Sequence, residues 1–122
     1  MPKKILVADD EPFVLRSIEY TLSRAGYTVL KAVDGEEALQ KVLSESPDLV
    51  FLDIQMPRLD GHEVCRRLRE STDHRDLYVI VITAKGQESE RLLALESGAS
   101  EYITKPYSPR KMLERVREIL GE

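Results

Sequence analysis

The ten residues DLVFLDIQMP, Asp48 to Pro57, decide the fold of this chain. Their four consecutive apolar residues, Leu49 to Leu52, predict a strand buried on both faces, because a strand with one wet face would alternate apolar and polar side chains. The strand ends on the carboxylate of Asp53, and Pro57 with Asp60-Gly61 predicts a loop beyond it. A charge at the end of a buried strand costs solvation free energy unless a site uses it. A lone aspartate here could simply cap the next turn, so the rest of the chain decides between a cap and a site.

Length and composition predict one domain, residues 1–122, that buries a full core without disulfides or metal. The net charge of −4 gives no basic footprint, so we expect neither direct nucleic-acid binding nor attraction to an anionic membrane. One cysteine and no signal-type or membrane-length apolar run indicate a protein of the reducing cytoplasm.

Four further strands are expected on either side of this stretch. Continuous apolar runs at Ile5–Ala8 and Tyr78–Ile82 predict buried strands, whereas the shorter, more polar runs Thr28–Ala32 and Glu101–Thr104 predict sheet edges. A helical spacing of apolar residues follows each strand, including one helix expected from about Glu88 to Ser97. The apolar residues of the five helices are Leu15, Ile18, Leu22 and Ala25; Ala38, Leu39, Val42 and Leu43; Val64, Cys65 and Leu68; Leu92, Leu93 and Leu95; and Met112, Leu113, Val116, Ile119 and Leu120.

Alternating strands and helices predict an α/β fold, a doubly wound five-stranded parallel sheet with five helices. The two polar strands fit the edges of the flavodoxin-like order 2-1-3-4-5, in which ligands bind beyond the carboxyl ends of the first and third strands. Asp9, Asp10 and Asp53 fall at that crevice, and Thr83 and Lys105 end the fourth and fifth strands. Five polar side chains are therefore expected at one edge of the sheet.

Three neighbouring carboxylates repel one another and raise each other's pKa values, and a divalent cation relieves this. Carboxylate oxygens completed by water and a phosphate favour Mg²⁺. Zn²⁺ is disfavoured, because His62 and His74 are not at ligand spacing and Cys65 is predicted to be buried.

A carboxylate beside Mg²⁺ can attack phosphorus and form an aspartyl-phosphate. The hydroxyl of Thr83 and the ammonium of Lys105 would then neutralise the transferring oxygens. Taken singly, the acids could favour a helix N-terminus, Thr83 could be a turn residue and Lys105 a solvated charge. Their joint position at the ends of four strands favours a site instead, with Asp53 as a phosphoryl-accepting nucleophile.

These residues give the chain a resemblance to the receiver domain of two-component response regulators, over essentially its whole length and in the form of a single receiver like a chemotaxis regulator. The matching motifs are Asp9-Asp10, Asp53 within Leu52–Pro57, Asp60-Gly61, Thr83-Ala84 and Lys105-Pro106. The resemblance implies that Asp10 ligates Mg²⁺ directly and Asp9 mainly through water, with Asp53 and the backbone carbonyl of Gln55 completing the protein ligands. It also implies a cis Lys105-Pro106 bond.

The resemblance further implies partners. The phosphoryl donor would be a phosphohistidine on a sensor histidine kinase or a phosphotransfer protein. The chain would be a signalling domain that catalyses its own phosphorylation and dephosphorylation, rather than an enzyme. Its output would go to a downstream protein or to an effector domain missing from this sequence, since a stand-alone receiver and one cut from a longer regulator or hybrid kinase both fit.

Switching and phosphate lifetime are expected to depend on residues near the acceptor. Tyr102 lies where receiver domains usually carry a switch aromatic, so inward movement of Thr83 would let its ring turn inward and remodel the face of the fourth helix, fifth strand and fifth helix. The alternative is an ordinary edge-strand aromatic. Gln55 and Lys85, each two residues beyond a site residue, would tune autodephosphorylation. Mixed charges could support phosphorylation-promoted homodimerisation: Glu88, Glu90, Arg91, Glu101, Arg110, Lys111 and Arg115.

Two other functions use related folds or chemistry. An aspartyl-phosphate phosphatase of the haloacid-dehalogenase type wants an acid two residues after its nucleophile, where this chain has Gln55. A flavodoxin-like binding module would place a phosphate at the loop after the first strand, where Asp9-Asp10-Glu11 would repel it. Arg66, Arg67 and Arg69 on the third helix are interpreted as a solvated face.

Overall fold

The computed structural model describes residues 2–83, 92–93, 95–105 and 108–121. Five parallel strands form one sheet in the order β2-β1-β3-β4-β5, which confirms the predicted topology and both predicted edges. The strands are β1 (Lys4–Ala8), β2 (Thr28–Ala32), β3 (Leu49–Asp53), β4 (Tyr78–Thr83) and β5 (Glu101–Thr104). Every residue of β3 is buried, as its apolar run predicts.

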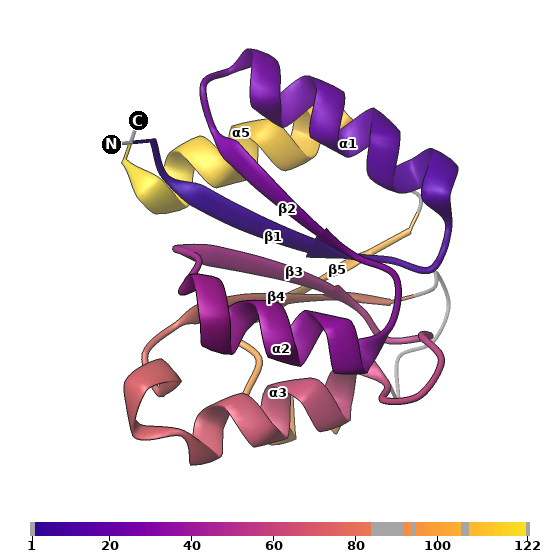
Figure 1. Cartoon of the computed structure of the whole chain (residues 1–122), viewed down its shortest axis with the longest axis vertical. Helices are drawn as coiled ribbons and strands as arrows, with labels where there is room; N and C mark the ends of the chain where they lie inside the picture. The colour runs from indigo at the N-terminus through magenta and orange to yellow at the C-terminus, as the bar shows by residue number, and fades with distance from the viewer. Residues whose placement is uncertain (1, 84–91, 94, 106–107, 122) are drawn as a thin grey trace.

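Helices cover both faces of the sheet, α1 and α5 on one and α2 and α3 on the other (Figure 1). Their bounds are α1 (Pro12–Arg24), α2 (Gly35–Glu45), α3 (Gly61–Glu70), a short 3₁₀ helix η1 (Thr72–His74) and α5 (Pro109–Leu120). Of the helix expected at 88–97, residues 88–91 and 94 lie outside the described residues. Within the described part, Leu92, Leu93 and Leu95 are helical and exposed.

The strands alternate their side chains between two apolar clusters because successive residues point to opposite faces. Leu6, Val50 and Val81 join the cluster beneath α2 and α3. Ile5, Phe51 and Ile80 join the one beneath α1 and α5. In β1, β3 and β4 this double burial leaves polar side chains only at the strand ends.

Local chemistry explains where the helices begin. Pro12 occupies the first turn of α1. The side chain of Asp34 accepts from the Glu37 N–H at 2.8 Å and so caps α2, while Ser108 caps α5 by accepting from the Lys111 N–H at 3.1 Å. The N-cap and N1 proline predicted for the last helix are thereby confirmed.

Two expectations about side-chain burial are wrong. Leu43, expected on the buried face of α2, is 54% exposed, because the buried stripe runs through Gly35, Ala38 and Val42 and the next residue along the helix turns away from it. Arg66 and Arg67 are exposed, but Arg69 is not part of that solvated face. Its guanidinium donates to the carbonyl oxygens of Gly98 at 2.8 Å and His74 at 3.0 Å.

Candidate phosphoacceptor site

Asp53, the last residue of β3, is 3% exposed and fully engaged. Its Oδ1 accepts from the Gln55 N–H at 3.0 Å, and its Oδ2 accepts from Nζ of Lys105 at 2.6 Å. Lys105 reaches this position because its own N–H donates to the carbonyl of Thr83 at 2.7 Å, which continues the β4–β5 pairing by one residue. The parallel register therefore brings together two residues that are 52 apart in the sequence.

Asp9 follows β1 and has no exposed surface. Its Oδ1 accepts from the Glu11 N–H at 2.9 Å, whereas its Oδ2 is buried without a hydrogen-bond partner, 3.8 Å from Nζ of Lys105. Burial raises the pKa of the Asp9 carboxyl to about 6, and the nearby charge of Asp53 adds to the rise. A buried acceptor with no donor costs free energy, and a metal cation bound beside this oxygen would remove that cost.

The metal-site residues expected from the sequence do converge. Asp9, Asp10 and Asp53 each offer a carboxylate oxygen, and these oxygens lie within 4.8 Å of one another. An all-oxygen set with one unsatisfied buried member fits Mg²⁺, which completes its shell with water and phosphate. Gln55, the fourth expected ligand, is joined to the set through its N–H bond to Asp53 and has an exposed side chain.

Lys105 is the cation of the described site. Partial burial lowers the pKa of its ammonium, but the hydrogen bond and charge of Asp53, with the charges of Asp9 and Glu11, outweigh this and raise it. The side chain is therefore protonated at neutral pH and available to neutralise anionic oxygens.

The two expected switch residues lie on neighbouring strands. Thr83 ends β4, is 2% exposed, and donates to the Ile103 carbonyl at a long 3.5 Å. Such a length indicates a weak bond that the hydroxyl can exchange for a better acceptor. Tyr102 is half-buried on β5 and packs against the apolar cluster beneath α2 and α3. Lys85 and the Lys105-Pro106 bond lie outside the described residues.

Glu101 and Arg115, two of the charges expected on a dimer face, contact each other within the chain. Nε of Arg115 donates to Oε2 of Glu101 at 2.9 Å, and the Tyr78 hydroxyl donates to Oε1 at 2.5 Å. The hydrogen bond from Arg115 lowers the pKa of the Glu101 carboxyl. These contacts tie α5 to the edge strand of the sheet.

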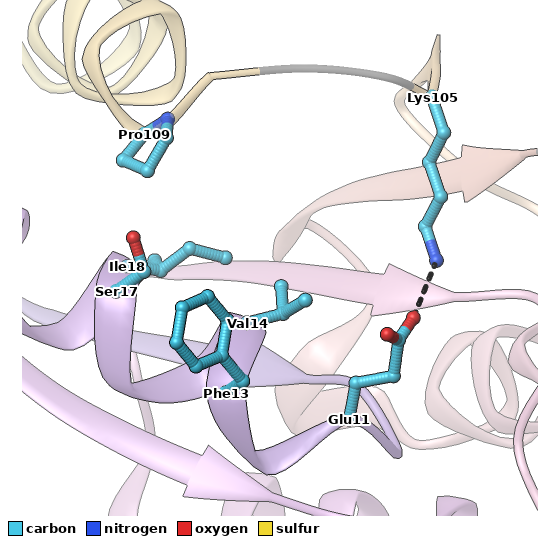
Figure 2. A pocket seen from close by; sticks show the side chains of 7 residues that line it. All are labelled: Glu11, Phe13, Val14, Ser17, Ile18, Lys105 and Pro109. Carbon is cyan, nitrogen blue, oxygen red and sulfur yellow. Dashed lines mark ion pairs between the residues drawn. The ribbon is translucent and has the colours of Figure 1, made fainter.

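Sequence reasoning missed an apolar groove of about 310 Å³ beside the site. Figure 2 shows Phe13, Val14 and Ile18 of α1 on one side of it, Pro109 on the other, and the Lys105–Glu11 ion pair, 3.9 Å long, at one end. Phe13 is 76% exposed. The sequence offered one signal for this groove. Phe13 is an aromatic residue that does not share the helical spacing of the buried residues of α1, which are Leu15, Ile18 and Leu22.

Comparisons with known proteins agree on the family. The family model of the response regulator receiver domain matches residues 5–117. The alkaline phosphatase synthesis transcriptional regulatory protein PhoP of Bacillus subtilis is 48% identical over 120 residues, 98% of this chain and 49% of that protein. Response regulator MprA of Mycolicibacterium vanbaalenii is also 48% identical, over 98% of this chain and 51% of its own length.

Solved structures show the same fold. A CheY-like response regulator receiver domain protein of Methanospirillum hungatei has a TM-score of 0.90 at 30% identity, covering 99% of this chain and 95% of its own. The chemotaxis response regulator CheY4 of Vibrio cholerae has a TM-score of 0.90 at 26% identity, covering 98% and 99%.

This chain belongs to the response regulator receiver domain family of two-component systems. It spans about half the length of the curated relatives named above. Among its described helices, none is long and apolar enough to cross a membrane.

Proposed function

We propose that the chain accepts a phosphoryl group on Asp53 from a phosphohistidine carried by a sensor histidine kinase or phosphotransfer protein, with Mg²⁺ as cofactor. The observation that carries this proposal is the arrangement of one cation and one unsatisfied acid around the same carboxylate. Lys105 holds Asp53 at 2.6 Å, while the buried Oδ2 of Asp9 lacks a donor. Bound Mg²⁺ would satisfy the acids and supply positive charge to the phosphoryl oxygens.

The transfer itself is a displacement at phosphorus. A carboxylate oxygen of Asp53 attacks phosphorus as the P–N bond breaks, and the histidine ring, which carries a proton on its other nitrogen, takes the electron pair of that bond and leaves as neutral imidazole. Lys105 exchanges its bond to Asp53 for one to a phosphoryl oxygen, so its charge stabilises the transition state without leaving the site. On this proposal the chain promotes its own phosphorylation and dephosphorylation and turns over no separate substrate.

The groove beside the site supports docking of a protein donor. The phosphohistidine must come within bonding distance of Asp53, so its carrier covers the surface around Lys105, which borders the groove. An apolar groove with a charged end suits a helix with an apolar stripe. The exposed ring of Phe13 would supply buried area in that complex.

Output would follow from the two strands that end at the site. The phosphoryl oxygens offer Thr83 a stronger acceptor than its 3.5 Å bond to Ile103. Movement of this hydroxyl would release Tyr102 and shift the population of the β5–α5 face that a downstream protein or effector domain recognises. Homodimerisation through this face, and tuning of phosphate lifetime by Gln55 and Lys85, belong to the same proposal.

Intact-mass measurement after incubation with Mg²⁺ and acetyl phosphate tests the proposal. We expect one phosphoryl adduct on the native chain and on the control Asp73→Asn, whose exposed aspartate lies on η1. We expect none on Asp53→Asn or when Mg²⁺ is chelated. The proposal would be contradicted if the native chain accepted a phosphoryl group from neither acetyl phosphate nor a phosphorylated kinase.

A further inference from the structure

The loop of residues 54–60, between β3 and α3, carries Gln55 two residues after Asp53, the proposed phosphoacceptor. Its first residue is fixed by the sheet, because the Ile54 N–H donates to the Ile82 carbonyl at 3.1 Å and the Ile54 carbonyl accepts from the Gly61 N–H at 3.1 Å. Ile54 and Met56 are each only 8% exposed. The start of the loop is therefore fixed by hydrogen bonds of its backbone and by the burial of two of its side chains.

The outer half of the same loop lies against the N-terminus of α2. The Gly35 N–H approaches the Pro57 carbonyl at 3.4 Å. A Cβ added to Gly35 would lie 1.9 Å from the carbonyl oxygen of Leu59, so any other residue would force the two segments apart. The contact is thus one that only glycine permits.

Arg58 adds a second connection between the loop and α2. Its φ of +72° lies in the left-handed region, which only one other non-glycine residue of the described chain adopts. Nε of Arg58 lies 3.3 Å from Oδ2 of Asp34, the residue that caps α2, and Nη1 lies 3.8 Å from Glu36. Ion pairs at this exposure stabilise little by themselves, and a strained backbone persists only where its surroundings hold it.

We propose that the N-terminus of α2, acting through Gly35, and the left-handed backbone of Arg58 together position residues 54–60 so that the backbone carbonyl of Gln55 is aligned as a metal ligand. The proposal rests on the Mg²⁺-dependent function proposed above. Gln55 lies between Ile54, which the sheet holds, and Pro57, which the Gly35 segment holds. The position of the Gln55 peptide is therefore fixed by contacts on both sides of it. How well its carbonyl oxygen can bind Mg²⁺ depends on those contacts. Partners of metal ligands control affinity in this way in other sites.

Two substitutions of Arg58 separate backbone geometry from charge. Arg58→Val and Arg58→Asn both remove the guanidinium, but asparagine tolerates the left-handed conformation and a β-branched residue does not. We expect Arg58→Val to weaken Mg²⁺ binding by about tenfold, and Arg58→Asn to stay within about twofold of the native chain. The measurement is a Mg²⁺ titration followed by the backbone amide NMR shifts of Asp53 and Gln55, without any phosphodonor.

A matched control lies at the other end of α2. Ser46, with a φ of 49°, is the other left-handed non-glycine residue of the described chain. Ser46→Val should lower the melting temperature through the same backbone strain and leave Mg²⁺ affinity unchanged. Gly35→Ala should weaken Mg²⁺ binding by displacing Leu59. The Arg58 pair decides the matter if the Gly35 variant does not fold.

The outcomes are distinguishable. A native chain that binds no Mg²⁺ overturns the proposed function and this inference with it. A native chain that binds Mg²⁺, while Arg58→Val binds as well as Arg58→Asn, overturns the inference and leaves the proposed function standing. Equal weakening by Arg58→Val and Ser46→Val also overturns it, because the effect would then follow general destabilisation.

Discussion

The sheet has an amino edge, where its parallel strands begin, and a carboxyl edge, where they end. The charged side chains of these two edges differ in how well they are paired. At the amino edge, Asp48 precedes β3 and its Oδ2 accepts from the Lys4 N–H at 2.8 Å. Arg69 bridges His74, Gly98 and Ser100 there, donating to Ser100 Oγ at 3.2 Å. Asp48 and Arg69 therefore both have partners within the chain.

The carboxyl edge, by comparison, contains a buried polar atom that has no hydrogen bond. Asp53 ends β3 and shares Lys105 with Asp9, the acid that follows β1 and whose Oδ2 has no hydrogen bond. The loop after Asp53 includes Arg58, whose backbone has a left-handed φ. The contacts of Asp48 and Arg69 at the amino edge therefore stabilise the fold, whereas the unpaired oxygen of Asp9 at the carboxyl edge costs stability, as expected where parallel strands end at a site.

The largest effect should come from removing the cation of the carboxyl edge. Lys105→Gln deletes the ammonium that the site would use on phosphoryl oxygens, and we expect about a hundredfold slower phosphorylation of Asp53. Intact-mass time courses with acetyl phosphate and Mg²⁺ measure this rate, with Lys111→Gln on α5 as the control. A rate within about twofold of native would remove Lys105 from the proposed transfer.

The next effect concerns the acid whose buried oxygen has no hydrogen bond. The pKa of Asp9 rises from 3.8 to about 6 on folding, so the folded chain holds this proton more tightly than the unfolded chain. The resulting stabilisation is present below pH 3.8 and is lost as the pH rises through 6.

In metal-free protein, Asp9→Asn should therefore raise the free energy of unfolding by about 2 kcal/mol near pH 7 and by much less near pH 4. Urea titrations with a chelator present measure the difference. An equal gain at both pH values would show that the carboxylate charge is not the cause.

The amino edge should show the reverse behaviour. Arg69→Ala leaves several acceptors without their donor, and we expect it to lower the free energy of unfolding by about 2 kcal/mol. Arg67→Ala, which removes an exposed ion pair with Glu63 on the same helix, should cost less than about 0.5 kcal/mol. The phosphorylation rate of both folded variants should match the native chain, and a slower rate for Arg69→Ala would break the division between the edges.

The smallest effect lies along α1, which runs between the two edges. Phe13 borders the groove at the site, whereas Tyr20, also exposed at 63%, lies two turns further along. Phe13→Ala should raise the KM for a phosphorylated protein donor by about fivefold. Tyr20→Ala should not change it, and neither variant should alter the rate with acetyl phosphate. Equal effects of both substitutions would argue against docking in the groove.

Most of the fold could be predicted because its signals are local. Leu49 to Leu52 indicate a doubly buried strand without any knowledge of their neighbours, and the polarity of Thr28–Ala32 indicates an edge. The site residues could also be predicted, because each ends a predicted strand and a parallel sheet places the carboxyl ends of its strands together. Leu43 shows the limit, because a periodicity argument could not decide which of two adjacent apolar residues faces the core.

The sequence by itself determined the strand order, the helix starts at Pro12 and Ser108, and the convergence of Asp9, Asp53 and Lys105 at one edge. Each of these follows from the pattern within one element or from the rules of parallel sheets. The tertiary structure alone decided that Oδ2 of Asp9 lacks a partner, that Arg69 binds carbonyls of distant segments, and that Gly35 touches the loop beyond Asp53. These features depend on distances between atoms far apart along the chain, and such distances exist only once the layers have packed.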